Sequence, residues 1–419
     1  MSENATAPAR QNAEFTCAHG EMAAVLKIAE FGIDPRHANP AQRGVVIETA
    51  NGHVTFSTYD FDTAVRVSMA CPTTNAPGTS LLDFTELSKT LAALAVGEPK
   101  TAAAATEVSL AGDLLSGKDM TVPIGALDPA AYVGAPAPAP ATVLLDAKGF
   151  RTQLDRVLPA VGTDLTLPAL TGIQLTFGAA TCTLAATDRY RLAVAELPAH
   201  PAAQTPPPGG DTVEINVPGS FLRRLIKPLK DYDGPLGIGV SEDRTYATFT
   251  LGHITFSFRL LDGRLPRYER LFPKTVAASL RIDRAALAAA TKKCAAVLKA
   301  KGADRLTPVS FLWDDDGALT LAPALPEPQD RARLKGIPVP YLTAGASVDL
   351  RRSAHSLNHA YLAAALDTFT CDTITIHLPG TENGQGLQKP VLFTAGPDLQ
   401  GDDYRHLLMA VRLDFTWEL

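Results

Sequence analysis

The run of three aspartates from Asp314 to Asp316 is the clearest candidate for metal chemistry, because divalent cations prefer carboxylate oxygens. The apolar residues Phe311 to Trp313 precede the run, and Gly317 with alternating apolar residues follows it. This pattern is typical of a strand, an Asp-Gly turn and a second strand. We therefore interpret the three aspartates as a hairpin turn.

Two histidines, His355 and His359, are four residues apart in a segment that we expect to be helical. On a helix they would share one face and could both bind a metal. No third ligand lies nearby in the sequence, so a surface pair is the preferred interpretation. The chain also has no glycine-rich phosphate loop, nucleophile elbow or paired-cysteine motif. We therefore expect no catalytic residues, no metal and no cofactor, with a metal-dependent nuclease or phosphatase as the competing hypothesis.

The elements around these residues form a weak threefold repeat. The second helix of each copy is expected to open at Asp83, near Pro218, and at Ala354 to Leu357, with starts about 135 residues apart. The first helices are expected over Met22 to Phe31, Lys148 to Leu158 and Arg284 to Leu298, from apolar residues at three- and four-residue spacing.

Strand-like runs repeat in the same order. They begin at Gly44, Gly172 and Pro308, and Asp60 and Asp188 each follow sixteen residues after the first two starts. Alternating polar and apolar residues predict half-buried antiparallel strands. Strands with paired helices indicate an α+β domain used three times. The Pro-rich segment 134–140 marks the first joint, and the expected domains are 1–140, 141–275 and 276–419.

Composition sets the remaining limits. The chain has 419 residues, 46% hydrophobic and 20% charged, which is typical of a globular protein with several domains. Its net charge of −6 argues against a generic nucleic-acid coat but permits basic residues gathered on one face. Five scattered cysteines, no signal-like N-terminus and no apolar run of membrane length favour the cytoplasm.

Three motifs resemble those of the bacterial DNA polymerase III beta subunit family, the DNA sliding clamps. Ala186 to Ala193 (ATDRYRLA) resembles the family's ATDGHRLA, Leu261 to Tyr268 (LDGRLPRY) its VDGRFPDY, and Met409 to Leu413 (MAVRL) its C-terminal MP(M/V)RL. The resemblance covers nearly the whole chain in register with the threefold repeat. It implies three clamp domains per chain, and two chains closing head to tail into a six-domain ring with helices lining the hole.

Such a ring implies a processivity factor of DNA replication that encircles duplex DNA without reading its sequence and tethers the polymerase and clamp loader. Topology would retain the ring, and weak phosphate attraction would centre it. The alternative is that the basic helix positions are ordinary solvated faces. The expected DNA-facing residues are Lys148, Arg151, Arg156, Arg223, Arg224, Lys227, Lys230, Lys292 and Lys293.

The resemblance also implies a groove that binds short peptides with apolar anchors. Here Arg189 replaces the motif's glycine, Leu265 its phenylalanine and Ala410 its proline, so this chain could be a specialised second clamp whose altered groove resists an inhibitor. The expected groove residues are Leu170, Thr187, Arg189, Tyr190, Arg191, Leu192, Pro266, Arg270, Leu271, Pro390, Leu407, Met409, Ala410, Val411, Arg412 and Leu413.

Two further expectations concern the ends of the chain. By alignment, the subunit interface of the homodimer would pair Met120 and Val122, on an edge strand, with Val297 and Leu298. Six residues, 414–419, extend beyond the usual family terminus. They would either cover the chain's own groove as a lid, or extend the last strand or pack on the outer sheet.

Overall fold

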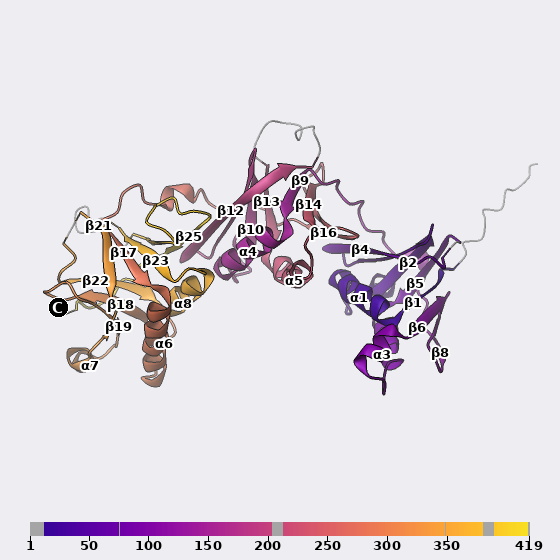
Figure 1. Ribbon diagram of the computed structural model, residues 1–419, viewed down its shortest axis with the longest axis horizontal. Coiled ribbons are helices and arrows are strands. Elements are labelled where there is room, and N and C mark those ends of the chain that lie inside the picture. Colours follow the sequence, from indigo (N-terminus) through magenta and orange to yellow (C-terminus); the bar gives the residue numbers. More distant parts are fainter. Residues whose placement is uncertain (1–11, 75, 203–212, 348, 380–388, 418–419) are drawn as a thin grey trace, which may run out of the picture. The chain divides into compact units, whose positions relative to one another are not determined.

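The computed structural model describes residues 12–74, 76–202, 213–347, 349–379 and 389–417 (Figure 1). In these residues the order of elements repeats three times: a strand and a helix, a group of strands, a second helix, and three strands. The predicted strand starts at Gly44, Gly172 and Pro308 are confirmed as the first residues of β2, β10 and β18. The fold is therefore α+β and built from a repeated unit, as the sequence indicates.

The first repeat begins its second helix, α2, at Phe84, because the side chain of Asp83 accepts a hydrogen bond from the Glu86 amide and caps the helix. The first helix, α1, begins three residues earlier than predicted. The elements are β1 (Glu14–Ala18), α1 (His19–Ala29), η1 (Glu30–Gly32), η2 (Pro40–Arg43), β2 (Gly44–Ala50), β3 (His53–Tyr59), β4 (Thr63–Ala70), β5 (Gly78–Asp83), α2 (Phe84–Ala93), α3 (Lys100–Ala105), β6 (Glu107–Ala111), β7 (Leu114–Ser116), β8 (Thr121–Pro123) and η3 (Pro129–Ala131).

The second repeat has two strongly amphipathic helices, whose apolar residues are buried and whose charged residues are mostly exposed. Its elements are β9 (Val143–Asp146), α4 (Ala147–Val157), η4 (Leu158–Ala160), η5 (Pro168–Thr171), β10 (Gly172–Phe177), β11 (Thr181–Thr187), β12 (Arg191–Pro201), β13 (Val213–Pro218), α5 (Gly219–Lys230), β14 (Pro235–Val240), β15 (Tyr246–Leu251), β16 (Ile254–Arg259) and η6 (Glu269–Leu271).

The third repeat corrects one prediction. Residues 354–357 lie in strand β22 rather than opening a helix, and α8 begins at His359 after the cap residue Asn358. The elements are β17 (Ala278–Asp283), α6 (Arg284–Ala300), β18 (Pro308–Trp313), β19 (Leu319–Pro323), α7 (Pro328–Arg333), β20 (Ile337–Pro338), β21 (Tyr341–Ala346), β22 (Ser353–Asn358), α8 (His359–Thr368), β23 (Thr373–Leu378), β24 (Val391–Thr394) and β25 (Tyr404–Leu408).

The chain divides into two compact units, which are described separately. The first comprises residues 1–147, 200–210 and 227–260, and the second comprises residues 148–199, 211–226 and 261–419. In the first unit, β8-β7-β6-β1 form one sheet, and β9-β14-β15-β16-β4-β3-β2-β5 form a continuous antiparallel run. Pairing between β16 and β4 joins strands of the first and second repeats.

In the second unit, β13-β10-β11-β12-β25-β24-β23-β17-β21 form another antiparallel run, and β22-β18-β19-β20 form a smaller sheet. Helices α6 and α8 pack against each other, and α6 also packs on β19 (Figure 1). Pairing between β12 and β25 joins the second and third repeats. The central repeat thus adds strands to a sheet of each neighbouring repeat. For this reason the chain divides into two compact units rather than three. The boundaries of the three domains stay a prediction.

Candidate functional site

A candidate peptide groove is built where the central and last repeats share a sheet. Strands β12 and β25 pair antiparallel, with Leu192 opposite Leu407. Beyond the strand end, the amide of Met409 donates a hydrogen bond of 2.8 Å to the Tyr190 carbonyl. The shared strands therefore bring together the two most distant motifs of the predicted site.

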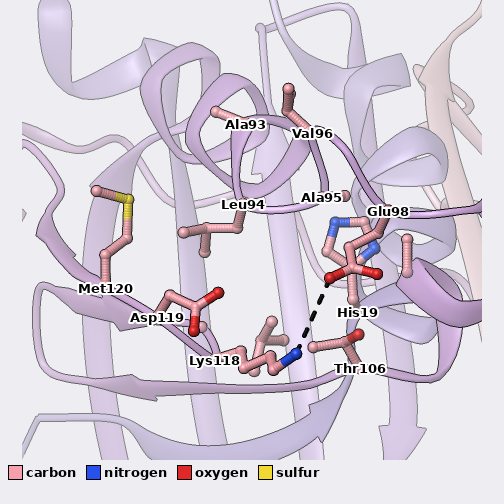
Figure 2. Close-up of a pocket in the computed structure, with 13 residues that line it drawn as sticks. His19, Ala93, Leu94, Ala95, Val96, Glu98, Thr106, Lys118, Asp119 and Met120 are labelled. Atoms are coloured by element: carbon pink, nitrogen blue, oxygen red, sulfur yellow. Dashed lines mark ion pairs between the residues drawn. The ribbon is translucent and has the colours of Figure 1, made fainter.

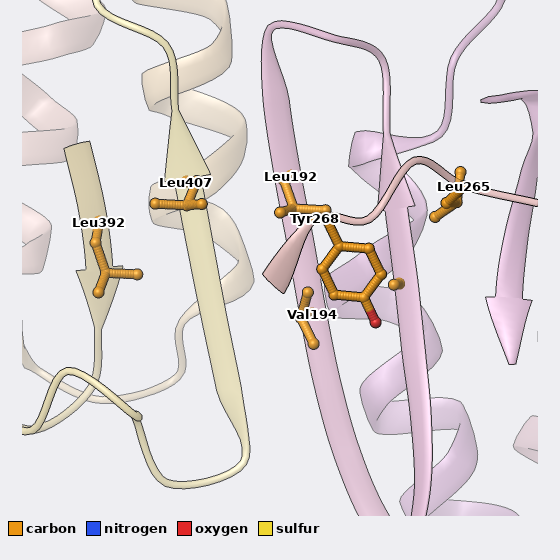
Figure 3. Close-up of a cluster of buried hydrophobic side chains, with 7 residues drawn as sticks. Leu192, Val194, Leu265, Tyr268, Leu392 and Leu407 are labelled. Carbon is orange, nitrogen blue, oxygen red and sulfur yellow. The ribbon is translucent and has the colours of Figure 1, made fainter. Parts of the chain in front are cut away.

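An apolar cluster, drawn in Figure 3, lies at this junction and would form the floor of the groove. Leu192 and Leu407 are each 2% exposed, so these predicted groove residues are part of the core. Burial also raises the pKa of the Tyr268 hydroxyl to about 12, which keeps this ring neutral. The cluster consists of Ala185, Leu192, Val194, Leu265, Tyr268, Leu392 and Leu407, with Leu170, Phe272 and Leu399 packed against it.

Three predicted groove residues leave apolar surface beside this floor. Tyr190 is 53% exposed, Leu271 50% and Met409 36%. Exposed apolar surface over a buried cluster is what an apolar peptide anchor requires. Of the other predicted groove residues, Pro266, Arg270 and Arg412 are exposed, and Leu170, Thr187, Pro390, Ala410, Val411 and Leu413 are half-buried.

The turn that carries Arg189 is held by its neighbours. Asp188 accepts hydrogen bonds from the amides of Tyr190 and Arg191 and pairs with the Arg191 side chain at 3.0 Å. Thr187 donates its hydroxyl to the Arg191 carbonyl and accepts from the Arg189 amide. Arg189 has a φ of 80°, a backbone conformation that favours glycine. An arginine at the family's glycine position is therefore held in a conformation that costs it about 1 kcal/mol.

Arginine and tyrosine side chains form the adjoining wall. The rings of Tyr190 and Tyr361 are stacked at 6.2 Å, and the Arg191 guanidinium lies 4.5 Å from the Tyr361 ring centroid. Arg189 pairs with Asp164 at 3.8 Å. Hydrogen bonds from Thr166, assisted by Arg189, lower the pKa of Asp164. Sequence analysis missed Tyr361 and Asp164, the first because the start of α8 was misplaced.

Helix α5 has a basic face. Leu222, Leu225 and Leu229 are at most 1% exposed. All four predicted lining residues of this helix, Arg223, Arg224, Lys227 and Lys230, are exposed. The helix therefore buries a leucine stripe and presents its cations to solvent, as an electrostatic contact with phosphates requires.

A lysine of α1 joins this face in the first unit. The ammonium group of Lys27, by hydrogen bonding and charge repulsion, lowers the pKa of the adjacent Lys227. Lys27 therefore adds to the positive charge near Lys227. Sequence analysis missed Lys27 because it is the only lysine or arginine on its helix.

The predicted DNA-facing residues outside α5 differ in their exposure. Lys148, Lys292 and Lys293 are exposed. Arg151 is half-buried and pairs with Asp155 at 3.8 Å. Arg156 was predicted to face DNA, and this is wrong: its side chain is 16% exposed and pairs with Asp403 at 2.9 Å. The pair joins α4 to the loop before β25, so Arg156 holds the second unit together.

The predicted residues of the subunit interface also differ in their exposure. Met120 is 59% exposed, and Val122 lies on β8, an edge strand of its sheet. A pocket lies beside Met120, and Figure 2 shows Leu94, Val96 and Met120 around it. Val297 is 41% exposed, but Leu298 is 1% exposed, so the inclusion of Leu298 is corrected: its own subunit already covers it.

The structure also tests the two candidate metal sites, the three aspartates and the two histidines. Asp314 accepts hydrogen bonds from the amides of Asp316 and Ala318 in a turn between β18 and β19, so the hairpin interpretation is confirmed. His355 lies in β22 and His359 begins α8, so the two histidines do not share a helix face. In the part of the chain that the structure describes, no group of three potential metal ligands occurs and no helix is long and apolar enough to span a membrane.

The C-terminal segment contacts the smaller sheet of the second unit. The indole nitrogen of Trp417 donates a hydrogen bond of 3.2 Å to the Ser310 hydroxyl on β18. The Arg331 guanidinium lies 3.6 Å from the Phe415 ring centroid. Residues 418–419 lie outside the described residues. The lid hypothesis is therefore wrong for residues 414–417, and packing on the sheet is confirmed.

Comparisons with known proteins agree with the motifs. Residues 144–267 match the family described as the central domain of the DNA polymerase III beta subunit. The chain is 26% identical over 399 residues to a beta sliding clamp of Streptomyces coelicolor, covering 94% of this chain and 97% of that protein. It is 27% identical over 268 residues to the beta sliding clamp homolog GriR of Streptomyces muensis, covering 64% and 69%.

A solved structure shares the fold. The Pseudomonas aeruginosa DnaN sliding clamp bound to griselimycin superposes with a TM-score of 0.77 at 18% identity, over 96% of this chain and 99% of that one. The repeated α+β architecture, the family match in the central repeat and the near full-length relative agree with one another. The chain is therefore similar to the beta sliding clamps over nearly its whole length, and it shares their fold.

Proposed function

We propose that this protein is a processivity factor of DNA replication: two copies close into a ring that encircles duplex DNA and tethers the replicative polymerase. The ring would slide because its lining attracts phosphates without contacting base edges, and it would stay bound because the DNA passes through it. No chemical step is part of this function, so the protein would act without catalysis or cofactor. The proposal includes the three domains 1–140, 141–275 and 276–419, and action in the cytoplasm, where its five free cysteines fit a reducing environment.

The observation that carries the proposal is the exposed basic face of α5. Arg223, Arg224, Lys227 and Lys230 all lie in solvent above a leucine stripe, in a chain whose net charge is −6. Lys27 adds a further cation beside Lys227. This concentration of positive charge on an acidic protein fits a local contact with DNA better than a generic affinity for nucleic acid.

The test compares retention on nicked circular and linear DNA after loading by a clamp loader. We expect the protein to remain on circles and to leave linear DNA through its ends. Equal retention on both would contradict a topological link. Replacing Arg223, Arg224 and Lys227 by glutamate should reduce loading and lower the salt slope by about 0.9 for each lost phosphate contact. Arg66→Glu, on β4, is the control for a single charge reversal away from α5, to be compared with Arg223→Glu alone.

For partners, we infer that polymerase and clamp-loader subunits place short peptides over the apolar cluster where β12 pairs with β25. The buried floor with Tyr190, Leu271 and Met409 exposed beside it supports this inference. Met409→Ala with Leu271→Ala tests it better than Leu192→Ala, because truncating the buried Leu192 would cost about 2–5 kcal/mol of stability. The double variant should lose a polymerase-tail peptide and keep its dimer mass.

A second candidate is a specialised clamp whose groove excludes an inhibitor. The observation that favours it is Arg189, which occupies a glycine position at a φ of 80° beside Tyr190. Griselimycin, the compound bound to the Pseudomonas aeruginosa clamp, is a direct probe. This candidate predicts weak binding by the parent and tighter binding by Arg189→Gly. Equal affinity of the two proteins would leave the housekeeping function as the better proposal.

A further inference from the structure

The C-terminal segment, 411–417, leaves the last repeat along the course that the linkers take out of the other two repeats. At each exit, one amide donates a hydrogen bond to the carbonyl three residues before the start of the second helix. The three pairs are Leu127 to Leu81 at 2.9 Å, Leu261 to Asn216 at 2.9 Å and Val411 to Ser356 at 2.8 Å. The segment therefore has the position of a linker in the threefold repeat.

The second linker and the C-terminal segment also contact equivalent strands. The amide of Leu265 donates a hydrogen bond of 2.9 Å to the side chain of Gln174, the third residue of β10. The indole of Trp417 donates one of 3.2 Å to the hydroxyl of Ser310, the third residue of β18. Because β10 and β18 occupy matching places in their repeats, the two segments cross the same part of the repeated unit.

Each linker within the chain covers the strands by which two repeats are joined. Leu265 and Tyr268 of the second linker are 7% and 8% exposed, and they belong to the apolar cluster that contains residues of β12 and β25. Ala135 and Pro138 of the first linker line a small cavity together with residues of β4 and β16. Linker side chains are thus part of both junctions between repeats.

Two strands in the corresponding positions, β20 and β8, are not joined to each other. β20 follows β19 as β4 follows β3 and β12 follows β11, and β8 follows β7 as β16 follows β15 and β25 follows β24. At the two junctions, β4 pairs with β16 and β12 pairs with β25. Among the strands that the structure describes, β20 pairs only with β19, and β8 pairs only with β7. Both sheet edges can therefore pair with a second copy, head to tail.

Contacts with α7 hold the C-terminal segment close to β20. The Arg331 guanidinium lies 3.6 Å from the Phe415 ring centroid and donates hydrogen bonds of 2.8 and 2.6 Å to two backbone carbonyls just before α7. The last residue of α7 is four residues before the first residue of β20. Phe415 and Trp417 are only half-buried, whereas Leu265 is buried in a cluster that includes side chains of the next repeat. The two aromatic rings therefore keep apolar surface for a neighbouring repeat.

We propose that Phe415 and Trp417 belong to the subunit interface, where they cover the pairing of β20 with β8 of the partner subunit. They act there as the linkers act at the two junctions within the chain. This inference rests on the proposed ring and names a further segment of its interface. Half-buried aromatic rings supply apolar area that a partner can bury, and such side chains contribute much of the binding energy of an interface.

Sedimentation equilibrium tests this inference through the dissociation constant of the dimer. The double variant Phe415→Ala with Trp417→Ala should raise this constant at least about tenfold, because truncating an aromatic anchor weakens an interface and the ring has two interfaces. Arg156→Ala is the matched control for stability, since it weakens the same unit through a pair that joins α4 to the loop before β25. We expect this control to lower the urea midpoint and to keep the parent's dimer constant.

A photocrosslink tests the contact directly. Replacing Phe415 by p-benzoylphenylalanine, which bonds to neighbouring groups under ultraviolet light, should link two chains covalently in the dimer. The same replacement of Leu165 is the control, because Leu165 is 83% exposed and lies in the central repeat. We expect the second protein to give no linked dimer under the same irradiation.

Three results would overturn the inference. A parental dimer constant in the double variant would show that the C-terminal segment only packs on its own sheet. An equal rise of the constant in Arg156→Ala would show that the two rings act through stability alone. A dimeric protein without a crosslink from position 415 would place Phe415 outside the interface. A parent that stays monomeric at every concentration would refute the proposed ring itself, and this inference with it, which is a separate outcome.

Discussion

Replacing Arg156 by alanine should weaken folding of the second unit rather than its contact with DNA. The Arg156 guanidinium donates hydrogen bonds to Asp403 at 2.9 Å and to Gln153 at 3.2 Å. It also lies 5.5 Å from the Tyr404 ring centroid. The Tyr404 hydroxyl in turn donates to the Arg156 carbonyl at 3.0 Å. These contacts join α4 of the central repeat to β25 of the last one.

The magnitude follows from the exposure of the partners. Asp403 is 51% exposed, so solvent screening limits its pair with Arg156 to about 0.5–1 kcal/mol. The hydrogen bond to Gln153 and the contact with Tyr404 add about 0.5–1 kcal/mol each. The buried Nε of Arg156 has no hydrogen-bond partner among the described residues, and its removal returns part of that desolvation cost. The expected loss is about 2 kcal/mol.

Urea unfolding followed by tryptophan fluorescence measures this loss, because Trp313 and Trp417 both lie in the second unit. Lys148→Ala is the control on the same helix, since Lys148 is exposed. We expect Arg156→Ala to lower the urea midpoint and to keep the parent's salt slope for DNA binding. Lys148→Ala should keep the parent's urea midpoint and reduce the salt slope. An Arg156 variant with parental stability and a reduced salt slope would refute the reasoning and return Arg156 to the DNA-facing set.

Three further predictions concern the same unit. Val297→Asp should give monomers in sedimentation, because a charge at a buried contact costs several kcal/mol; an unchanged dimer would place the interface elsewhere. Deleting residues 414–419 should lower stability by about 1–2 kcal/mol and leave peptide affinity unchanged, whereas unchanged stability would contradict a structural role for the contacts of Phe415 and Trp417. Burial lowers the pKa of three histidines to about 4, 4 and 3, so the unfolded state takes up protons first as the pH falls. The three histidines are His355, His377 and His406. The free energy of unfolding should drop by about 1 kcal/mol for each of them between pH 7 and 5.5, and replacing one of them by glutamine should reduce that drop.

The threefold repeat was readable from sequence because its signals are local. Strand alternation and the cap at Asp83 depend on neighbouring residues, and both occur in the structure where predicted. The predicted start of α8 was wrong because residues 354–357 belong to β22, the strand that precedes the helix. Asn358 caps α8 with the same chemistry that Asp283 supplies to α6. Aligning the repeats on their capping side chains would have placed the helix correctly.

The errors in the candidate site have two different causes. Arg156 was assigned to the DNA-facing surface because its partner, Asp403, is 247 residues away and gives no local signal. Leu298 was assigned to the interface from the resemblance, although Leu287, Thr291, Cys294 and Leu298 follow the helical spacing of a buried stripe. In the second case the local pattern was right and the alignment was misleading.

Lysine is found on the basic helix faces of this protein but not in the segments around the apolar cluster. The helices α1, α5 and α6 contribute Lys27, Lys227, Lys230, Lys292 and Lys293, and α5 also contributes Arg223 and Arg224, all exposed. A hydrated ammonium attracts a phosphate without imposing a fixed geometry, which suits a surface that must let DNA slide. Segments 187–192, 261–272 and 404–413, which surround the apolar cluster, contain arginine and no lysine. The planar fork of arginine favours one orientation of a carboxylate. The same charge thus fits weak, mobile attraction on the helices and selective, oriented binding in the groove.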